Sequence, residues 1–233
     1  LLYLLFLSLT TILMAPVMYA LHWVMPFPQV AKLGTLWGRL NLWAVDVICG
    51  LSYRVHGMEN LPRENCIVLS KHQSAWETIA LRALLPSQNT WVIKRELLWI
   101  PFFGWGIAAL DPIAIDRTGG RQALKQLLQD GRKWLEAGRW VVIFPEGTRV
   151  ALGERRKYNP GGALLAEKTG YPILPVAHNA GVFWRRRGLL KYPGVIELVF
   201  GEPISTKGLK AAEINQKVED WIEGTIARLP QVR

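Results

Sequence analysis

The chain has 233 residues, of which half are apolar and a fifth are charged. This length suits one large domain or a domain with an appendage, and the composition excludes intrinsic disorder, collagen and low-complexity sequence. Cys49 and Cys66 exclude a disulfide framework, and with four scattered histidines they leave no spacing typical of structural zinc. A net charge of +10 indicates an anionic partner, and 11 tryptophans favour a membrane surface over nucleic acid.

The first segment of the chain has the pattern of a membrane helix. No Asp, Glu, Lys or Arg occurs in residues 1–31, and Leu1–Val24 is almost wholly apolar. That run can cross a hydrocarbon core of about 30 Å at about 1.5 Å per residue. We expect Pro16 to kink this helix, and Pro26 and Pro28 to end it. A cleaved signal peptide is the alternative, although no small-x-small cleavage site follows the apolar run.

A second helix is predicted after the first, because apolar residues recur at helical spacing on one stripe. Thr35, Arg39, Asn41 and Asp46 lie off that stripe. The helix either packs on the following domain or lies in the membrane interface, and both hold if its two faces differ. The stripe consists of Leu33, Leu36, Trp37, Leu40, Ala44, Val47, Ile48 and Leu51.

Beyond residue 51, short apolar runs alternate with helical patterns. This alternation predicts an α/β fold with a largely parallel sheet covered by helices on both faces. In such sheets, functional sites lie on loops at the carboxyl ends of strands. The predicted strands are Tyr53–His56, Cys66–Ser70, Trp91–Lys94, Ile113–Asp116, Trp140–Phe144, Ile173–Ala177 and Val195–Phe200. The predicted helices are Trp76–Leu85, Arg121–Glu136, Gly162–Lys168 and Ala211–Arg228.

A histidine and a carboxylate follow the second predicted strand, in the stretch Lys71-His72-Gln73-Ser74-Ala75-Trp76-Glu77. A carboxylate that holds one imidazole nitrogen as N–H leaves the other nitrogen free to take a proton. On a continuous helix the two side chains would diverge by roughly 140°. The pair therefore requires His72 in the loop before the helix and Glu77 in its first turn. A structural histidine with a capping acid is the alternative.

Two further loops follow predicted strands. The stretch Phe144-Pro145-Glu146-Gly147-Thr148-Arg149 offers a glycine that lets backbone approach a ligand and a guanidinium suited to phosphate oxygens. The strand at 113–116 delivers Asp116 and Arg117 to the same edge. Taken singly, these segments also fit a tight turn with a solvated arginine and a surface ion pair.

In this order, the segments over residues 52–205 resemble the glycerolipid acyltransferase family, specifically its bacterial 1-acyl-sn-glycerol-3-phosphate acyltransferases. The resemblance rests on the histidine block at 71–77, Lys94–Arg117, the Phe-Pro-Glu-Gly-Thr-Arg block and the strand around Pro175. Most of that family has Asp five residues after the histidine, where this chain has Glu77. The carboxylate is kept, but the extra methylene requires the helix to start slightly further away.

The resemblance implies an acyltransferase domain over residues 52–233, anchored by membrane helices over residues 1–51. It implies transfer of a fatty acyl group from acyl-carrier protein or coenzyme A to the 2-hydroxyl of lysophosphatidic acid. His72 is expected to act as general base and Glu77 to orient it, with no metal or further cofactor. The implied phosphate site consists of Arg149, Arg117, Gly147, Glu146, Thr148 and Lys94. The implied location is the cytoplasmic face of the bacterial inner membrane, next to anionic lipid.

Other functions stay open on these patterns. The net charge and Arg185–Arg187 suit nucleic-acid binding, but no recognisable module is present and the tryptophans do not interleave with the basic runs. A non-catalytic lipid-binding protein would keep the helices and the basic surface without needing His72 and Glu77. Within the enzyme class, glycerol-3-phosphate or another lysolipid is an alternative acceptor.

Overall fold

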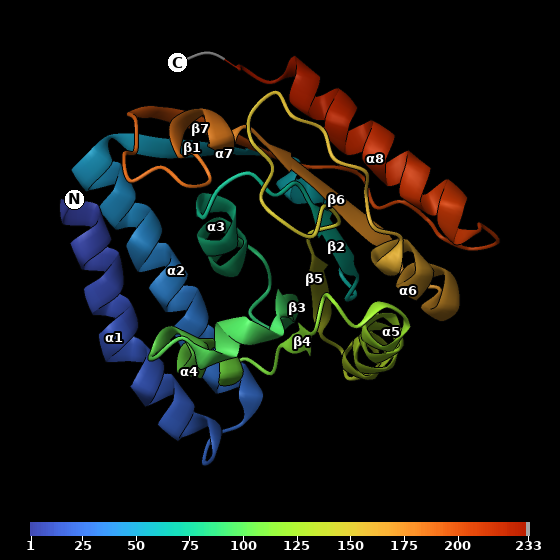
Figure 1. Cartoon of the computed structure of the whole chain (residues 1–233), viewed down its shortest axis with the longest axis horizontal. Helices are drawn as coiled ribbons and strands as arrows, with labels where there is room; N and C mark the ends of the chain where they lie inside the picture. The colour runs from blue at the N-terminus through green and yellow to red at the C-terminus, as the bar shows by residue number, and fades with distance from the viewer. Residues whose placement is uncertain (232–233) are drawn as a thin grey trace.

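Seven strands form one sheet in the order β1-β7-β6-β2-β5-β3-β4 (Figure 1). The structure, a computed structural model, describes residues 1–231. The strands are β1 (Leu51–His56), β2 (Ile67–Ser70), β3 (Asn89–Lys94), β4 (Ile113–Ile115), β5 (Trp140–Ile143), β6 (Ile173–His178) and β7 (Gly194–Phe200). All neighbours pair in parallel except β6 and β7, which are antiparallel. The prediction of a largely parallel α/β sheet is confirmed.

All four helices predicted beyond residue 51 are present at closely similar bounds. They are α3 (Trp76–Leu84), α5 (Gly120–Glu136), α6 (Gly161–Thr169) and α8 (Ala211–Arg228). The prediction missed α4 (Phe103–Ala108), α7 (Ala180–Phe183) and the 3-10 turns η1 (Met58–Asn60) and η2 (Arg95–Trp99). These elements are too short to show a helical period in the sequence.

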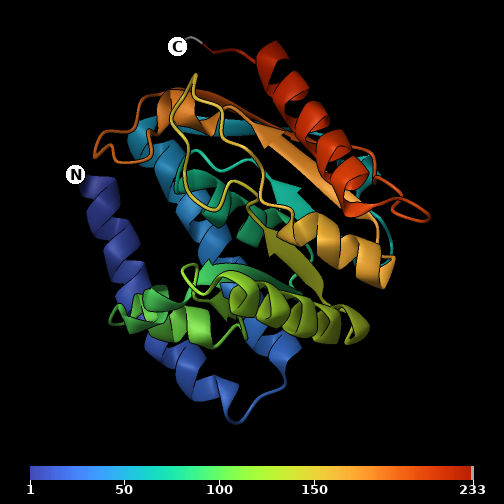
Figure 2. The same ribbon diagram turned by 45° about the vertical axis from the view of Figure 1, so that its right-hand side comes forward.

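The central strands are buried on both faces, so their side chains alternate between two hydrophobic cores. Val68 and Val142 point into a core that they share with α2 and α3, whereas Ile67 and Val141 point into a core that α5, α6 and α8 cover. Figures 1 and 2 show α1 and α2 on the side of the molecule away from α6 and α8. The predicted sheet with helices on both faces is therefore present as a three-layer arrangement.

The first predicted membrane helix is present as α1 (Leu2–His22), which continues through Pro16. It is long and apolar enough to cross a membrane. One side of α1 packs on α2 and on α4, where Gly106 lies against Ala15. The opposite side exposes Leu2, Leu5, Leu9, Leu13 and Val17.

The second helix, α2 (Phe27–Cys49), begins at the two prolines that were expected to end the first, with Pro26 as its N-cap. The predicted apolar stripe matches its buried face only in part: Ala44 is buried, and Leu33, Trp37 and Ile48 pack against the cores. Leu36 and Val47 are exposed, and Leu51 belongs to β1. The buried residues of α2 are Val30, Ala31, Gly34, Gly38, Asn41, Leu42, Ala44 and Val45.

Small residues explain this difference, because they let α2 approach its neighbours closely. Gly38 faces α3, where a Cβ atom would lie 3.1 Å from Ala83 Cβ and from the Ile79 carbonyl oxygen. Asn41 is fully buried and its Nδ2 donates to Thr10 Oγ1 and to the Trp37 carbonyl. A pattern that counts glycine and asparagine as polar therefore places the buried face wrongly.

Gly38→Leu is expected to destabilise the fold by about 1–3 kcal/mol, because a larger side chain must push α2 away from the backbone of α3. Thermal unfolding in detergent micelles measures the effect. Gly224→Ala is the matched control, since no atom lies within 4 Å of a Cβ there. It should leave stability unchanged or raise it by about 0.5–1 kcal/mol. Equal unfolding temperatures for Gly38→Leu and Gly224→Ala would contradict the close packing of α2 on α3.

Candidate active site

The carboxyl ends of four neighbouring parallel strands meet at one edge of the sheet. β2 leads into His72, β5 into the loop Phe144–Arg149, β3 ends at Lys94, and β4 is followed by Arg117. Because β2, β5, β3 and β4 are adjacent in the sheet, these segments converge in space, although His72 and Arg149 lie 77 positions apart in the sequence. The sequence prediction of a common site at this edge is consistent with this arrangement.

The His72 side chain is bound to a buried carboxylate. His72 Nδ1 lies 2.8 Å from Glu77 Oε1, and the Glu77 side chain is fully buried whereas that of His72 is 12% exposed. The backbone N–H groups of Gln73 and Ser74 donate to the same oxygen at 2.8 and 2.7 Å. One carboxylate oxygen therefore fixes both the ring and the loop that carries it.

The start of α3 produces this geometry. The helix begins at Trp76, whose backbone N–H donates to Ser74 Oγ at 3.1 Å. Glu77 lies in the first turn and folds back over the preceding loop, where His72 is located. The expectation that His72 precedes the helix is confirmed, because only a non-helical segment brings residues five apart to the same face.

Electrostatic and hydrogen-bonding neighbours keep Glu77 charged despite its burial. Burial by itself raises the pKa of a carboxyl group, but His178, His72 and the Ser74 N–H leave the pKa of Glu77 below its ordinary value. An ionised carboxylate accepts, so His72 Nδ1 carries the proton and donates. His72 Nε2 is then left as the unprotonated, basic nitrogen of the ring.

The His72 ring is also held from one side. Phe144 stacks on it with ring centroids 4.0 Å apart and an interplanar angle of 15°. The His72 carbonyl accepts from the Val150 N–H at 2.8 Å, which ties the β2 loop to the β5 loop. The imidazole is therefore constrained in both position and rotation, as a general base requires.

The β5 loop turns sharply at Gly147, which has φ +69°. This left-handed conformation favours glycine, and a Cβ would also lie 3.1 Å from Asn159 Nδ2. The Gly147 carbonyl accepts a hydrogen bond from Arg117 Nη1, and the Arg149 carbonyl accepts one from Arg186 Nη1. Backbone carbonyls of the loop thus hold two of the basic side chains near the site.

Glu146 does not face this site, contrary to the phosphate-binding role implied by the family motif. Its side chain is fully buried, with Oε1 2.7 Å from Lys71 Nζ and Oε2 accepting from the His72 N–H at 2.8 Å. Burial raises the pKa of Glu146 to about 7, against the opposing effect of Lys71. A carboxylate is a poor phosphate ligand, and here it anchors the two loops to each other.

The buried Lys71–Glu146 ion pair extends to Glu223 in α8. Lys71 Nζ also contacts Glu223 Oε1 at 2.8 Å, and the Tyr158 hydroxyl donates to that oxygen at 2.9 Å. Lys71 and Tyr158 are almost completely buried. Sequence reasoning missed these three residues, because a lone Lys, Tyr or Glu on separate elements carries no spacing signal.

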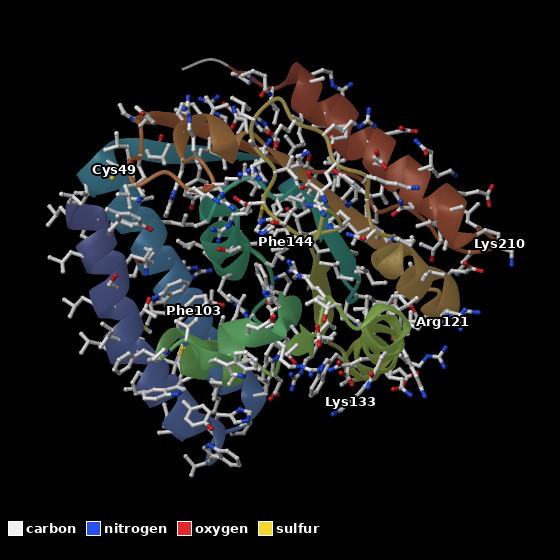
Figure 3. The ribbon with its side chains drawn as sticks, viewed as in Figure 1. Cys49, Phe103, Arg121, Lys133, Phe144 and Lys210 are labelled. Atoms are coloured by element: carbon white, nitrogen blue, oxygen red, sulfur yellow. The ribbon has the colours of Figure 1, made fainter. Side chains whose placement is uncertain are left out.

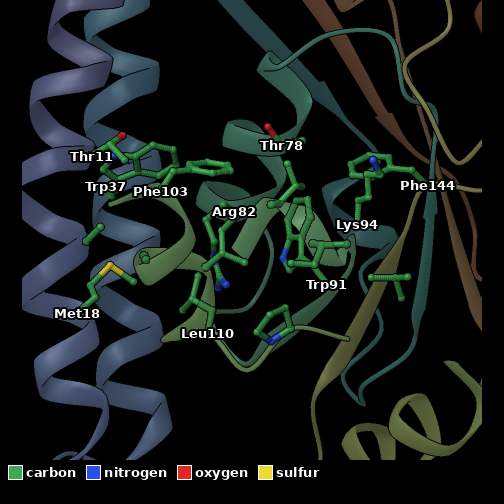
Figure 4. A pocket seen from close by; sticks show the side chains of 18 of the residues that line it. Thr11, Met18, Trp37, Thr78, Arg82, Trp91, Lys94, Phe103, Leu110 and Phe144 are labelled. Atoms are coloured by element: carbon green, nitrogen blue, oxygen red, sulfur yellow. The ribbon is translucent and has the colours of Figure 1, made fainter. Parts of the chain in front are cut away.

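A cavity of about 300 Å³ opens beside His72. His72, Lys94, Arg117 and Arg149 line it, whereas Gly147 and Thr148 do not, so any phosphate contact from those two stays a prediction. Figure 3 shows Phe144 near the middle of the molecule and Phe103 close to α1 and α2. The cavity extends between them (Figure 4), and its apolar wall includes Met14, Met18, Trp37, Trp91, Leu97, Phe103, Ile107 and Leu110.

The site therefore combines a basic histidine nitrogen, four cationic side chains, of which Arg82 is the fourth, and a long apolar wall. Lys94 pairs with Glu96 at 3.0 Å, and both side chains remain partly exposed. This combination suits a phosphorylated substrate with a hydrocarbon chain, whose hydroxyl group would lie near His72.

Known proteins share both the sequence pattern and the fold. A family model described as Acyltransferase matches residues 52–179. A Pseudomonas aeruginosa protein named 1-acyl-sn-glycerol-3-phosphate acyltransferase is 46% identical over 200 residues, which cover 84% of this chain and 77% of that protein. A Saccharomyces cerevisiae protein of the same name is 28% identical over 79% of this chain and 63% of its own length.

A solved structure extends the likeness to the whole fold. The crystal structure of the 1-acyl-sn-glycerophosphate acyltransferase from Thermotoga maritima superposes with a TM-score of 0.79 at 23% identity, covering 97% of this chain and 92% of that one. The match includes the region of α1 and α2, which precede the segment matched by the family model. On the extent of the family match and the 46% identity to the Pseudomonas protein, this chain belongs to the acyltransferase family.

Proposed function

We propose that the protein is a 1-acyl-sn-glycerol-3-phosphate acyltransferase. It transfers a fatty acyl group from a thioester to the 2-hydroxyl of lysophosphatidic acid and forms phosphatidic acid. The main observation behind the proposal is that the His72–Glu77 pair lies at a cavity whose lining includes Arg117, Arg149 and apolar side chains. The names of the relatives support the same acceptor.

The chemistry follows from the protonation states at the pair. His72 Nε2 accepts the proton of the 2-hydroxyl as its oxygen attacks the thioester carbonyl carbon, and Glu77 stabilises the imidazolium that forms. The tetrahedral intermediate collapses, the C–S bond breaks, and the thiolate takes the proton back from His72. Transfer is direct, and the sequence contains no G-x-S-x-G nucleophile motif.

The basic side chains supply the acceptor site. Arg149 and Arg117 bind the phosphate, and Lys94 adds a third cation at the end of β3. A guanidinium offers two parallel N–H donors to phosphate oxygens, so the arginines orient the glycerol backbone as well as bind it. The apolar wall from α1, α2 and α4 accommodates acyl chain.

The membrane supplies the acceptor, and α1 brings the site to it. The exposed leucines of α1 lie on the opposite side from its contacts with α2 and α4, so they are available to lipid. We assign the protein to the cytoplasmic face of the bacterial inner membrane. There its basic surface meets anionic lipid, and the acyl-carrier protein or coenzyme A thioester arrives from solution.

His72→Ala is expected to lower kcat by about 10²–10⁴-fold or more without unfolding the protein, because it removes the general base. Glu77→Gln should also lower kcat strongly, since it removes the negative charge that supports the imidazolium. A radiolabelled acyl thioester with purified protein and an acceptor panel measures both. His22→Ala, which changes a histidine at the end of α1, is the matched control. Wild-type turnover by folded His72→Ala would rule out the mechanism.

Arg149→Ala is expected to raise KM for lysophosphatidic acid and to lower kcat by misplacing the hydroxyl. Arg149→Lys should recover only part of the loss, because an ammonium group does not make the bidentate contact. Arg121→Ala, which removes an equal charge from the exposed surface of α5, is the control. Monoacylglycerol serves as the acceptor without phosphate. An equal loss with both acceptors would show that Arg149 supports the fold rather than phosphate binding.

Replacing Leu5, Leu9 and Leu13 together by Asp is expected to release the protein from membranes washed in high salt. Burial of each leucine side chain in lipid contributes about 1.5–3 kcal/mol to membrane binding, and ions do not screen this contribution. Flotation with liposomes measures the association. Arg185→Ala with Arg187→Ala, two exposed arginines, should weaken only the salt-sensitive part. Flotation of the triple Asp variant in 1 M salt, a concentration with a Debye length of about 3 Å, would place the anchor elsewhere.

A further inference from the structure

We propose that His178 is a positioning residue that holds the Glu77 carboxylate in place and acts on His72 through it. The proposal rests on the proposed function, because it requires the His72–Glu77 pair to carry the chemistry. His178 is the last residue of β6 and its side chain is completely buried. It is not among the residues that line the cavity.

The hydrogen bonds of His178 determine where its proton lies. The Ala180 backbone N–H donates to His178 Nδ1 at 3.2 Å, so Nδ1 is an acceptor. His178 Nε2 is 3.0 Å from the Lys71 carbonyl oxygen, which can only accept, so Nε2 carries the hydrogen. Protonation of Nδ1 would place its hydrogen against the hydrogen of the Ala180 N–H. Burial also lowers the pKa of His178, and the neutral ring is therefore its resting form.

The two oxygens of the Glu77 carboxylate differ in their hydrogen bonds. Oε1 accepts from His72 Nδ1 and from two backbone N–H groups. Among residues 1–231, Oε2 has no hydrogen-bond partner although it is buried. His178 Nε2 lies 4.0 Å from this second oxygen. That separation is too long for a hydrogen bond, but it places the positive edge of the ring beside the bare oxygen.

This contact matters because both side chains are fully buried, where bulk solvent screens charges only weakly. In a buried site, a fixed N–H dipole near a carboxylate favours the ionised form and resists rotation of the carboxylate. The groups that act on His178 are Glu77, which favours a positive ring, and His72 and Lys71, which oppose it. Because Lys71 Nζ is already engaged by Glu146 and Glu223, its charge is balanced there. His178 thus contributes a neutral dipole to Glu77.

The arrangement also joins the loop after β2 to β6. The Lys71 carbonyl immediately precedes His72, so a single His178 N–H contacts the backbone before the base and lies near the acid that orients it. We infer that loss of this donor lets the Glu77 carboxylate turn and the His72 ring follow. Substrate binding stays intact, since His178 does not line the cavity.

The test compares two substitutions of similar size in the full chain. His178→Gln keeps an N–H donor near the position of Nε2, and His178→Met removes it. His178→Met is expected to lower kcat by about 3- to 10-fold, the range for a lost hydrogen bond between neutral groups, here the one to the Lys71 carbonyl. KM for lysophosphatidic acid should change by less than about twofold. His178→Gln should restore most of the lost kcat. Thermal unfolding establishes that each variant is folded.

A double-mutant cycle then separates positioning from a general structural effect. In a Glu77→Gln background, His178→Met should reduce kcat by less than about twofold further, since residues that act through one another are not additive. The same fold-loss in both backgrounds, or a His178→Gln as impaired as His178→Met, would overturn the proposal. If His178→Met does not fold, His178→Asn replaces it, because its amide is one bond shorter and cannot reach the Nε2 position.

The proposed function and the role of His178 would be contradicted by different results. If folded His72→Ala keeps wild-type turnover, the proposed function fails whatever the result at His178. If His72→Ala and Glu77→Gln are inactive while His178→Met keeps wild-type kcat, only the role of His178 fails.

Discussion

The site depends on a carboxylate that has no contact with water. Glu77 Oε1 accepts three hydrogen bonds, and these determine where α3 begins, how the β2 loop runs and which nitrogen of His72 is free. A buried charge is tolerated only when it is bound in this way, since an isolated carboxylate would take up a proton. The same bonds that make Glu77 stable in the interior therefore prepare His72 to accept a proton.

A second buried network relates the histidine block to the arginine-bearing loop. Lys71 precedes His72, and Glu146 lies two residues after Phe144. His72 and Phe144 line the cavity, and the side chains of Lys71 and Glu146 pair beneath it. Removing one partner of such a pair costs about 3–5 kcal/mol, because the other is left as an uncompensated charge. Lys71 and Glu146 thus support the two loops and do not face the ligand cavity, and Glu223 extends that support to α8.

The sequence was sufficient for the strands, the long helices and the His72–Glu77 pair, because periodicity and loop position carry those signals. It was insufficient for the buried face of α2, where Gly38 and Asn41 provide close contact instead of apolar bulk. It also misassigned Glu146, since a motif gives the order of side chains but not their direction. His178 ends a wholly apolar-looking strand, and only the fold brings it to Glu77.

The central claim is that His72 presents an unprotonated Nε2 because Glu77 holds its Nδ1–H. Long-range ¹H–¹⁵N NMR of the imidazole rings at neutral pH tests this directly, and the chain has only four histidines to assign. The account predicts that His72 is protonated on Nδ1, and that this preference is lost in Glu77→Gln. A His72 ring protonated on Nε2 in the wild-type protein would contradict it.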